Sequence, residues 1–341
     1  MINDQGLYPV YGGNGLRGFT GSYNHDGDYI LIGRQGALCG NVRKVTGKTY
    51  VTEHAIAVCA SKEHETTFLQ HLFQKMRLGQ YSDQSAQPGL AVNKLLRLNI
   101  NVPSKNEQGK IAKILSLIDE RITTQNKIIE KLQSLIKGLN DSLYKQYGNA
   151  ITTSFSDLGH SYSGLSGKSS EDFGSGKPFI TYLNVYSNNV VNENEYQYVR
   201  INDGEKQNIV QCGDVLFTLS SETPEEVGVG SVYLGIDEVF LNSFCFGFHI
   251  DNKELAYPPY FSYYVSSTPF RKFIYPFAQG STRFNLCKAD FEKASIKLPS
   301  LNNQKYIYAI LNSITGKIET EKNLLEYYTT QKQYLLRQMF I

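Results

Sequence analysis

Two long stretches of the chain carry apolar residues in alternating steps of four and three, and this pattern limits what the chain can fold into. Such steps are typical of the seam of a left-handed coiled coil. The two stretches also copy each other, because Pro103 aligns with Pro299 and Gln108 with Gln304 at a constant offset of 196 residues, a multiple of seven. The chain is therefore expected to contain one unit twice, a globular segment followed by a long helix.

Each predicted helix has one polar residue in its apolar seam, Gln125 in the first and Glu321 in the second. If the helices pair antiparallel within one chain, these two residues meet near the middle and help to fix the register. The alternative is that the heptads only mediate dimerisation between chains, and the constant offset argues against it. The predicted seam comprises Ile111, Leu115, Ile118, Ile122, Gln125, Ile129, Leu132, Ile136, Leu139 and Leu143, and then Ile307, Leu311, Ile314, Ile318, Glu321, Leu325, Tyr328, Leu335 and Met339.

The length of 341 residues is sufficient for two domains, each with a core of its own. No run approaches the ~20 apolar residues of a membrane span, and the N-terminus does not resemble a signal peptide. The five cysteines are scattered and include no CxxC pair, which argues against a zinc site or a disulfide framework. These features predict a cytoplasmic protein with reduced thiols.

The segments outside the heptads contain short runs of β-branched and aromatic residues separated by Gly-rich turns. We therefore predict an α+β fold in which two globular segments of mixed β-sheet and short helices, 1–103 and 148–299, alternate with spacer helices at 104–147 and 300–341. The Gly-rich opening YPVYGGNGLRGFTGSYNHDGD is expected to consist mainly of turns.

Basic residues gather late in the second globular segment. Residues 271–297 contain six Lys or Arg against two acidic residues, although the whole of 148–299 has 11 basic against 17 acidic residues. A basic stretch inside an acidic domain indicates a face for a polyanion such as DNA, and the plainer alternative is an ordinary solvated surface.

The end of each globular segment shows the same closing pattern. The first copy reads Gln84-Ser85-Ala86, Leu90, Ile100-Asn101-Val102-Pro103, Glu107-Gln108 and Ile111; the second reads Gly280-Ser281-Thr282-Arg283, Leu286, Ile296-Lys297-Leu298-Pro299, Asn303-Gln304 and Ile307. With these patterns, and with the openings YPVYGGNGLRG, YILIGRQGALCG and YVTEHAIAV, the chain resembles the specificity subunits of type I restriction–modification systems over essentially its whole length.

The resemblance implies that each globular segment is a target recognition domain for one half of a split site in double-stranded DNA. The helices would set the gap between the half-sites and dock the methyltransferase subunits. Methylation and cleavage, with S-adenosylmethionine, ATP and Mg, would belong to methyltransferase and restriction (translocase and nuclease) partner subunits, and this chain would bind no cofactor. Domains of this family normally begin with a segment similar to 153–180, and the first copy has no equivalent before Tyr8. The first domain is therefore expected to be a shortened variant, or the reading frame to be truncated.

Base edges in the grooves of DNA are read mainly by Arg, Lys, Asn, Gln, Ser and Thr side chains. The strongest candidate segment is QGSTRFN, a Gly-containing turn that begins at Gln279. The candidates for DNA contact are Asn14, Arg17, Arg34, Gln35, Arg43, Lys44, Gln84 and Gln87 in the first domain, and Ser220, Ser221, Arg271, Lys272, Gln279, Ser281, Thr282 and Arg283 in the second.

Catalytic patterns are weak in this sequence. Residues 13–18 match GxGxxG, but the turn-rich stretch that follows is unsuited to the helix of a dinucleotide site. The Tyr-Pro-Pro-Tyr run at 257–260 lacks the acceptor that precedes Pro-Pro-Tyr in amino-methyltransferases, and the six His show no metal-ligand spacing. We predict a non-catalytic chain without a metal site. The alternatives are a coiled-coil adaptor that binds protein and not DNA, a truncated or silent specificity subunit, and a nucleotide- or S-adenosylmethionine-dependent enzyme.

Overall fold

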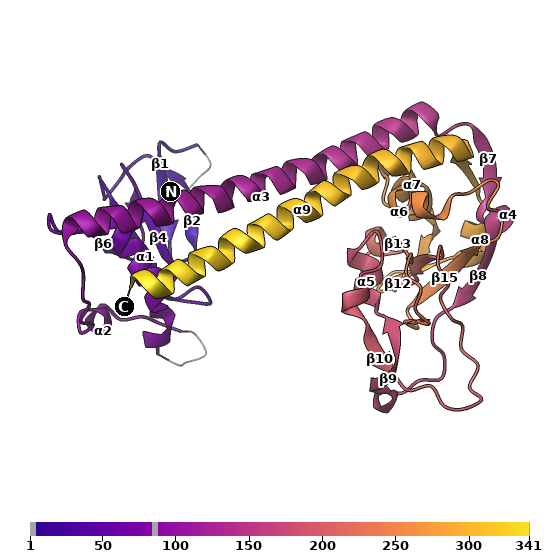
Figure 1. The fold of residues 1–341 in the computed structure, drawn as a ribbon, viewed down its shortest axis with the longest axis horizontal. Coiled ribbons are helices and arrows are strands. Elements are labelled where there is room, and N and C mark those ends of the chain that lie inside the picture. Colours follow the sequence, from indigo (N-terminus) through magenta and orange to yellow (C-terminus); the bar gives the residue numbers. More distant parts are fainter. Residues whose placement is uncertain (1–4, 84–87, 341) are drawn as a thin grey trace. The chain divides into compact units, whose positions relative to one another are not determined.

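The computed structural model describes residues 5–83 and 88–340, and the chain folds as two compact units (Figure 1). Unit 1 comprises residues 1–128 and 321–341, and unit 2 comprises residues 129–320. Each long helix is shared between the two units, so the division differs from the four consecutive segments predicted above. None of the helices in the described residues is long and apolar enough to cross a bilayer.

The described part of unit 1 contains two three-stranded sheets, β2-β1-β5 and β4-β3-β6. Its core consists of apolar residues from β3 and α1 together with the start of α3 and the end of α9, including Ile30, Phe68, Leu72, Leu115 and Phe340. The strands are β1 (Tyr8–Gly12), β2 (Gly15–Thr20), β3 (Tyr29–Gly33), β4 (Val42–Val45), β5 (Tyr50–Val51) and β6 (Ala55–Val58), and the helices are α1 (Thr66–Met76), α2 (Val92–Leu95) and a 3₁₀ turn at Leu78–Tyr81.

The opening of unit 1 differs from the prediction. The Gly-rich stretch was expected to form mainly turns, yet β1 and β2 make an antiparallel hairpin across it. A shift in register between Val10 and Tyr11 and positive φ angles at Gly15 and Gly18 let the hairpin bend. Glycine tolerates these angles because it has no Cβ. The GxGxxG match at 13–18 thus runs from the hairpin turn into β2, and no helix follows it, so a dinucleotide fingerprint is excluded at this position.

Unit 2 is larger and contains a four-stranded sheet, β13-β11-β15-β8, with three smaller sheets. Its strands are β7 (Ile151–Ser154), β8 (Gly159–Ser163), β9 (Phe173–Ile180), β10 (Gln197–Val199), β11 (Val215–Thr218), β12 (Ser220–Ser221), β13 (Gly230–Val232), β14 (Phe240–Leu241), β15 (Cys245–Ile250), β16 (Ala278–Gln279), β17 (Phe284–Leu286) and β18 (Ser295–Leu298). Its helices are α4 (Phe155–Leu158), α5 (Tyr182–Ser187), α6 (Phe261–Tyr264), α7 (Thr268–Ile274) and α8 (Lys288–Lys293), with 3₁₀ turns at Ser170–Asp172, Glu193–Glu195, Pro224–Glu226, Pro258–Tyr260 and Tyr275–Phe277.

A cluster of aromatic rings fills the core of unit 2. The Phe155 side chain is fully buried, and its ring centroid lies 4.6 Å from that of Phe291 and 5.1 Å from that of Phe248. Offset and edge-to-face ring pairs of this kind add stability beyond the area that they bury. The short helix α4, which begins with Phe155, therefore fastens the chain that follows α3 to the core of unit 2.

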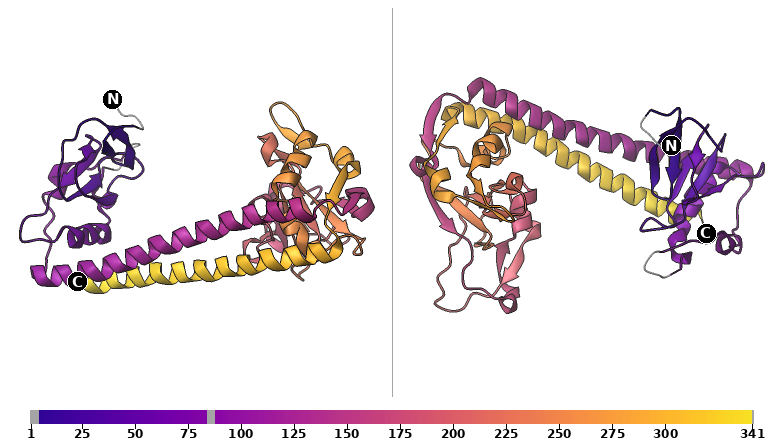
Figure 2. Two further views of the ribbon diagram at one scale, coloured as in Figure 1. Left: turned by 90° about the horizontal axis from the view of Figure 1, so that it is seen from above. Right: turned by 180° about the vertical axis from the view of Figure 1, so that it is seen from behind.

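The two long helices are α3 (Lys105–Tyr147) and α9 (Leu301–Met339). Every seam position predicted from the sequence is buried or half-buried in them, as the heptad pattern predicts. Several of these residues also pack in the cores of the two units. In unit 1 the end of α9 runs antiparallel beside the start of α3 (Figure 2), because Asp119 pairs with Lys332 at 2.6 Å while Gln125 meets Glu321. The amide Nε2 of Gln125 donates to the Glu321 carbonyl oxygen at 3.1 Å and also to the Glu321 carboxylate. The polar layer thus forms within one chain.

A buried glutamine anchors the start of each long helix. Gln304 donates through Nε2 to the carbonyl oxygens of Pro299 at 2.9 Å and Leu255 at 2.8 Å, and its Oε1 accepts from the Tyr257 N–H at 2.8 Å. Gln108 repeats this role in unit 1, where it donates to Pro103 O and accepts from the backbone N–H of Glu65, both at 2.9 Å. The repeated Pro and Gln of the sequence are therefore parts of one device that joins a helix to its domain.

The strand order repeats as well. The sheet β2-β1-β5 of unit 1 has the same order as β10-β9-β14 of unit 2, and β1 is parallel to β5 as β9 is to β14. The sheet β4-β3-β6 likewise corresponds to β13-β11-β15, with β8 as an additional strand in unit 2. The internal repeat thus covers the globular parts and not only the helices.

Candidate nucleic-acid interface

The segment QGSTRFN forms the turn between β16 and β17. These strands pair antiparallel, with Gln279 opposite Asn285. Gly280 has a φ of +146°, and a Cβ at this position would lie 2.1 Å from the Arg283 carbonyl oxygen, so only glycine fits. The turn leaves Ser281, Thr282 and Arg283 exposed, as a base-reading segment requires.

Arg283 lies at a groove of about 370 Å³ in unit 2. Its Nε donates to Ser220 Oγ at 3.0 Å, and its guanidinium carbon lies 5.5 Å from the centre of the Phe244 ring, which is 52% exposed. The hydrogen bond and the ring hold the guanidinium group at the groove. The groove is lined by Tyr182, Leu183, Tyr186, Ser220, Ser221, Glu222, Glu226, Phe244 and Arg283.

A carboxylate lies in the same groove. Glu226 accepts hydrogen bonds from the hydroxyl of Ser221 at 2.6 Å and from that of Tyr186 at 2.9 Å. The bond from Ser221, and then that from Tyr186, lowers the pKa of Glu226, so this group is charged at neutral pH. The groove therefore offers an acceptor that suits a cytosine amino group beside a guanidinium that suits guanine or phosphate.

Sequence reasoning missed the helix α5, which supplies one wall of this groove. The rings of Tyr182 and Tyr186 stack with centroids 6.1 Å apart, and Leu183 is 69% exposed. The spacing of the two tyrosines, one helical turn apart, is the only signal in the sequence for a shared face. Phe244 and Glu226 gave no signal at all, since they reach the groove from distant parts of the sequence.

The guanidinium group of Arg271 binds the backbone of its own domain and is not free to contact DNA. Its guanidinium donates to the carbonyl oxygens of Glu225, Val227 and Gly228 at 2.7, 2.9 and 2.5 Å. Burial lowers the pKa of Arg271, and the three carbonyl oxygens supply partners for the buried charge. Arg271 thus fixes the loop that carries Glu226, whereas its exposed neighbour Lys272 faces solvent. Among the candidates of unit 2, Ser220 and Ser221 are nearly buried and act through Arg283 and Glu226.

In unit 1 the candidates gather around the tight turn between β1 and β2. A Cβ on Gly13 would lie 2.7 Å from the His54 carbonyl oxygen and 3.4 Å from that of Gln35, so the turn packs closely on both segments. The Gln35 Oε1 lies 3.0 Å from His54 Nδ1. The exposed candidates Asn14, Arg17, Arg34, Gln35 and Arg43 belong to this region, and the Arg43 guanidinium lies against Gly15.

The other three candidates of unit 1 are Lys44, Gln84 and Gln87. The Lys44 ammonium group is already paired with Asp28 at 3.2 Å and donates to Thr67 Oγ1 at 3.1 Å. The pKa of Asp28 is lowered chiefly by this hydrogen bond from Lys44. Gln84 and Gln87 lie outside the described residues.

A buried polar cluster lies elsewhere in unit 2. Asp214, which is fully buried, accepts from the Gln211 N–H at 2.8 Å, from the Tyr162 hydroxyl, and pairs with His249 Nδ1 at 2.6 Å. Burial, and then the Asp214 charge, raises the pKa of Tyr162. The cluster ties β8 to β15 and to the start of β11. Among the described residues, no group of three His, Cys, Asp or Glu is placed to hold a metal ion.

Most of this chain matches the model of one protein family. The family model of the type I restriction modification DNA specificity domain matches residues 1–134 and 154–327. The chain belongs to this family. The two matched ranges correspond to the two copies of the internal repeat, each with part of its long helix.

Curated relatives share only part of their length with this chain. The type I restriction enzyme EcoprrI specificity subunit of Escherichia coli is 48% identical over 124 residues, which are 36% of this chain and 30% of the relative. The putative type I restriction enzyme specificity subunit S.HindORF215P of Haemophilus influenzae is 25% identical over 116 residues, 33% of this chain and 30% of the relative. The aligned part thus spans less than a third of either relative.

Solved structures of the family have the same fold. The crystal structure of a type I restriction-modification system S subunit from M. genitalium has a TM-score of 0.64 at 18% identity and covers 100% of this chain and 90% of that one. A structure described under complex assembly and conformational transition of the type I R-M system has a TM-score of 0.59 at 16% identity and covers 93% and 82%. At these identities the likeness concerns the fold alone.

Proposed function

We propose that the chain is a specificity subunit of a type I restriction–modification complex that reads a split site in double-stranded DNA and has no chemistry of its own. Family membership supports the general role. The proposal of two readers rests on one further observation. There are two clusters, the groove with Arg283 in unit 2 and the exposed polar side chains around the Gly13 turn in unit 1. They occupy the same place in the strand order of the two units.

The pairing of the strands shows that the two clusters lie at corresponding positions in the two units. In unit 2 the helix α5 follows β9, and in unit 1 the Gly13 turn follows β1, the strand that corresponds to β9. The flanking segment is β12 in unit 2, whose Ser220 pairs with Asn285, and in unit 1 Gln35 pairs with Gly89, the residue that corresponds to Asn285 at the offset of 196. One location in the domain thus carries the candidate groups twice.

The side chains at this common place differ, as two readers of different half-sites require. Unit 2 presents the Arg283 guanidinium, the Glu226 carboxylate and aromatic rings, whereas unit 1 presents the Gln35 amide with Asn14 and Arg34. Arg pairs best with guanine, and Asn or Gln with adenine. The remaining exposed candidates, Lys272 among them, would contact phosphates and position the duplex.

The outer faces of the two helices support the docking of partner subunits. Leu117 is 52% exposed, Tyr327 67% and Tyr334 61%, although the seam itself is covered. Exposed large apolar residues on an otherwise polar helix favour an interface. We propose that methyltransferase subunits dock there, in the cytoplasm, and that S-adenosylmethionine, ATP and Mg are bound only by the methyltransferase and restriction subunits.

The test is the methylome of a host that expresses this chain with its methyltransferase subunit. We expect one methylated split motif. The substitution Arg283→Ala should relax one half of the motif and Gln35→Ala the other, by about 10- to 100-fold in preference, since a good bidentate pair is worth ~1–3 kcal/mol. Lys253→Ala, an exposed charge outside both clusters, is the matched control and should leave the motif unchanged.

Two results would contradict the proposal. If the wild-type complex methylates no split motif, the adaptor or the silent-subunit alternative holds. If Arg283→Ala and Gln35→Ala relax the same half of the motif, the two clusters do not belong to separate readers.

A further inference from the structure

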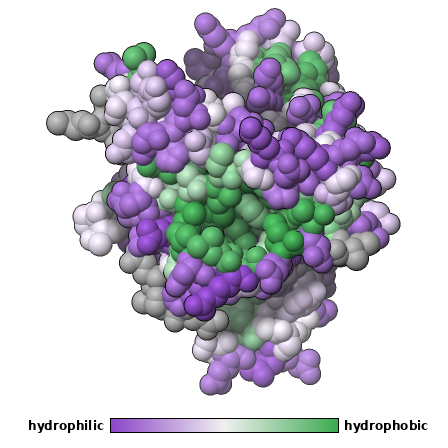
Figure 3. Space-filling model, turned by 90° about the vertical axis from the view of Figure 1, so that its left-hand side faces the viewer, coloured by the Kyte–Doolittle hydropathy of each residue, from purple (hydrophilic) through white to green (hydrophobic). Residues whose placement is uncertain are grey.

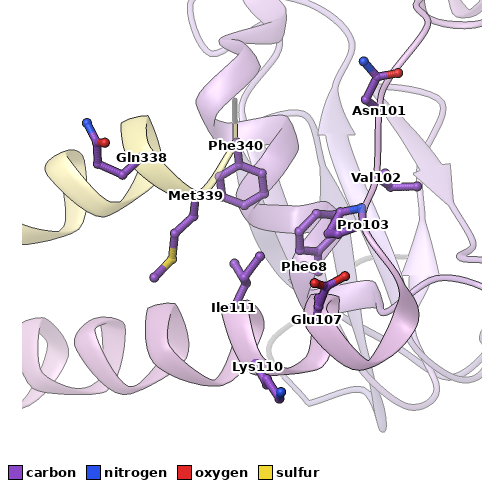
Figure 4. Close-up of a pocket in the computed structure, with 10 residues that line it drawn as sticks. All are labelled: Phe68, Asn101, Val102, Pro103, Glu107, Lys110, Ile111, Gln338, Met339 and Phe340. Atoms are coloured by element: carbon purple, nitrogen blue, oxygen red, sulfur yellow. The ribbon is translucent and has the colours of Figure 1, made fainter.

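Two hollows of the molecule differ in the chemistry of their linings. Unit 1 has a pocket of about 500 Å³, and Figure 3, which faces unit 1, shows an apolar patch that is hollowed at its centre and framed by hydrophilic residues. In the close-up of Figure 4, Phe68, Ile111 and Phe340 are directed toward one another, so this pocket suits apolar contacts. The groove of unit 2 instead combines the Glu226 carboxylate with the Arg283 guanidinium group and aromatic rings, so it suits polar recognition.

The backbone around Glu226 is held in place on several sides. The Glu226 carbonyl oxygen accepts a hydrogen bond from Thr218 Oγ1 at 2.9 Å. The carbonyl oxygens of its neighbours Glu225 and Val227 accept from the Arg271 guanidinium group at 2.7 and 2.9 Å. A site that is ordered before binding loses little entropy when its ligand arrives. These contacts therefore fix the place from which the Glu226 side chain enters the groove.

The carboxylate of Glu226 is oriented as well as placed. One of its oxygens accepts from the Tyr186 hydroxyl at 2.9 Å, and the other accepts from the Ser221 hydroxyl at 2.6 Å. A carboxylate has about four lone-pair sites, so it can still accept a donor from the groove. Glu226 is half-buried and belongs to the groove lining. A ligand that enters the groove thus meets an acceptor whose orientation is already set.

A negative charge in this groove opposes general binding of DNA. The duplex carries one negative charge on every phosphate, so a carboxylate lowers affinity unless it meets a hydrogen-bond donor. A base without that donor leaves the carboxylate desolvated and unpaired, which costs free energy. A site that is built to bond a polar group of its ligand rejects analogues without that group strongly. The carboxylate of Glu226 is therefore suited to discrimination between bases.

The base edges in the major groove limit what this carboxylate can accept from. Guanine and thymine present acceptors there and no amino group. Adenine presents its N6 amino group beside the N7 acceptor, and the N7 lone pair would repel a carboxylate. Cytosine presents its N4 amino group without an acceptor on the same edge. Cytosine is therefore the base that fits Glu226, as guanine fits the guanidinium group of Arg283 in the same groove.

We propose that Glu226 reads the N4 amino group of a cytosine in the half-site of unit 2, and that a methyl group on this nitrogen blocks recognition. This proposal rests on the proposed function, since it requires that the groove faces a half-site. In a base pair one N4 hydrogen bonds to guanine and the other lies in the major groove. Methylation replaces the second hydrogen, so it removes the donor and brings a methyl group against the carboxylate. N4-methylation of cytosine by another methyltransferase would thus hide the site from this chain.

The first experiment compares methylomes of hosts that express the methyltransferase subunit with the wild-type chain or a variant. Glu226→Gln should change one position from cytosine to adenine, in the half of the motif that Arg283→Ala relaxes, because Gln pairs bidentately with adenine. We expect a change in preference of at least about tenfold. Glu225→Gln, at the exposed neighbouring position, is the matched control and should leave the motif unchanged. The other half of the motif should stay intact in every variant, which reports a folded complex.

The second experiment measures binding of the same complex to synthetic duplexes with cytosine or N4-methylcytosine at that position. The wild-type complex should bind the methylated duplex at least about tenfold more weakly, because the carboxylate loses its donor. Glu226→Ala has no carboxylate, so it should bind the two duplexes within about twofold of each other. N4-methylcytosine in the unspecified gap is the control and should leave binding unchanged.

The outcomes distinguish this proposal from the proposed function. A wild-type complex that methylates no split motif would overturn both. This proposal alone fails if the motif is split but Glu226→Gln leaves every position unchanged or alters the half that Gln35→Ala relaxes. It also fails if the position altered by Glu226→Gln is an adenine in the wild-type motif. Equal binding of the wild-type complex to both duplexes, or an equal loss in Glu226→Ala, would show that the carboxylate does not contact N4.

Discussion

Removal of the Gln304 amide is expected to destabilise unit 2 by several kcal/mol. The side chain is fully buried and satisfies three backbone groups, the Tyr257 N–H and the carbonyl oxygens of Pro299 and Leu255. Leaving a buried polar group without a partner costs ~1–3 kcal/mol. Even if local rearrangement rescues one of the three, we expect Gln304→Ala to lower the free energy of unfolding by about 3 kcal/mol, before any cost of the cavity.

The design separates hydrogen bonding from packing. Gln304→Met keeps most of the volume and removes all three bonds, so it should lose nearly as much stability as Gln304→Ala. The matched variant in unit 1 is Gln108→Ala, which removes fewer short bonds and should cost about 2 kcal/mol. Gln331→Ala, at an exposed position of α9, is the control and should change stability by less than ~0.5 kcal/mol.

The assay has to follow the two units separately, because a chain with two compact units need not unfold in one step. Denaturant-dependent hydrogen exchange reports each unit from its own peptides. Gln304→Ala should accelerate exchange in unit 2 and Gln108→Ala in unit 1. The reasoning is refuted if Gln304→Met retains wild-type stability, since the hydrogen bonds would then contribute nothing.

Three further predictions follow from other contacts. Arg271→Ala should free the loop that carries Glu226 and lower stability by ~2–4 kcal/mol, because three carbonyl oxygens lose their donor; thermal denaturation measures it, and an unchanged midpoint would contradict the assigned role. Ser221→Ala removes the largest cause of the lowered pKa of Glu226, so this pKa should rise in an NMR titration. Because the folded-state pKa is the lower one, the stability due to Glu226 is present above its ordinary pKa of 4.5 and is lost as the pH falls through the folded value. Gln125→Leu should destabilise the helix pair by ~1–3 kcal/mol in denaturant titrations, because it removes the amide that donates to the Glu321 carbonyl oxygen and carboxylate; unchanged stability would contradict a role for the polar layer.

The long helices, the repeat and the fold class could be predicted from the sequence because periodicity is local and survives in every environment. The hairpin of β1 and β2 could not be predicted, because glycine favours turns and is also found in bent hairpins.

The groove of unit 2 could be predicted only in part, because most of its contacts join residues that are far apart in the sequence. The exposed turn with Arg283 could be predicted from its own residues. The role of Arg271 could not, because its partners lie more than forty residues away, and that of Phe244 could not, because it depends on a contact with Arg283 from a separate turn.

The segment that follows β9 in unit 2 has a different structure from the segment that follows β1 in unit 1. In one unit it is the helix α5 with two stacked tyrosines, and in the other it is a tight turn at Gly13 and Asn14. The parallel strands beneath, β9 with β14 and β1 with β5, pair alike in both units. Variation can therefore be inserted at this strand end without disturbing the sheet, so that a lineage, or an engineer, could acquire a new recognition preference by grafting one short connection.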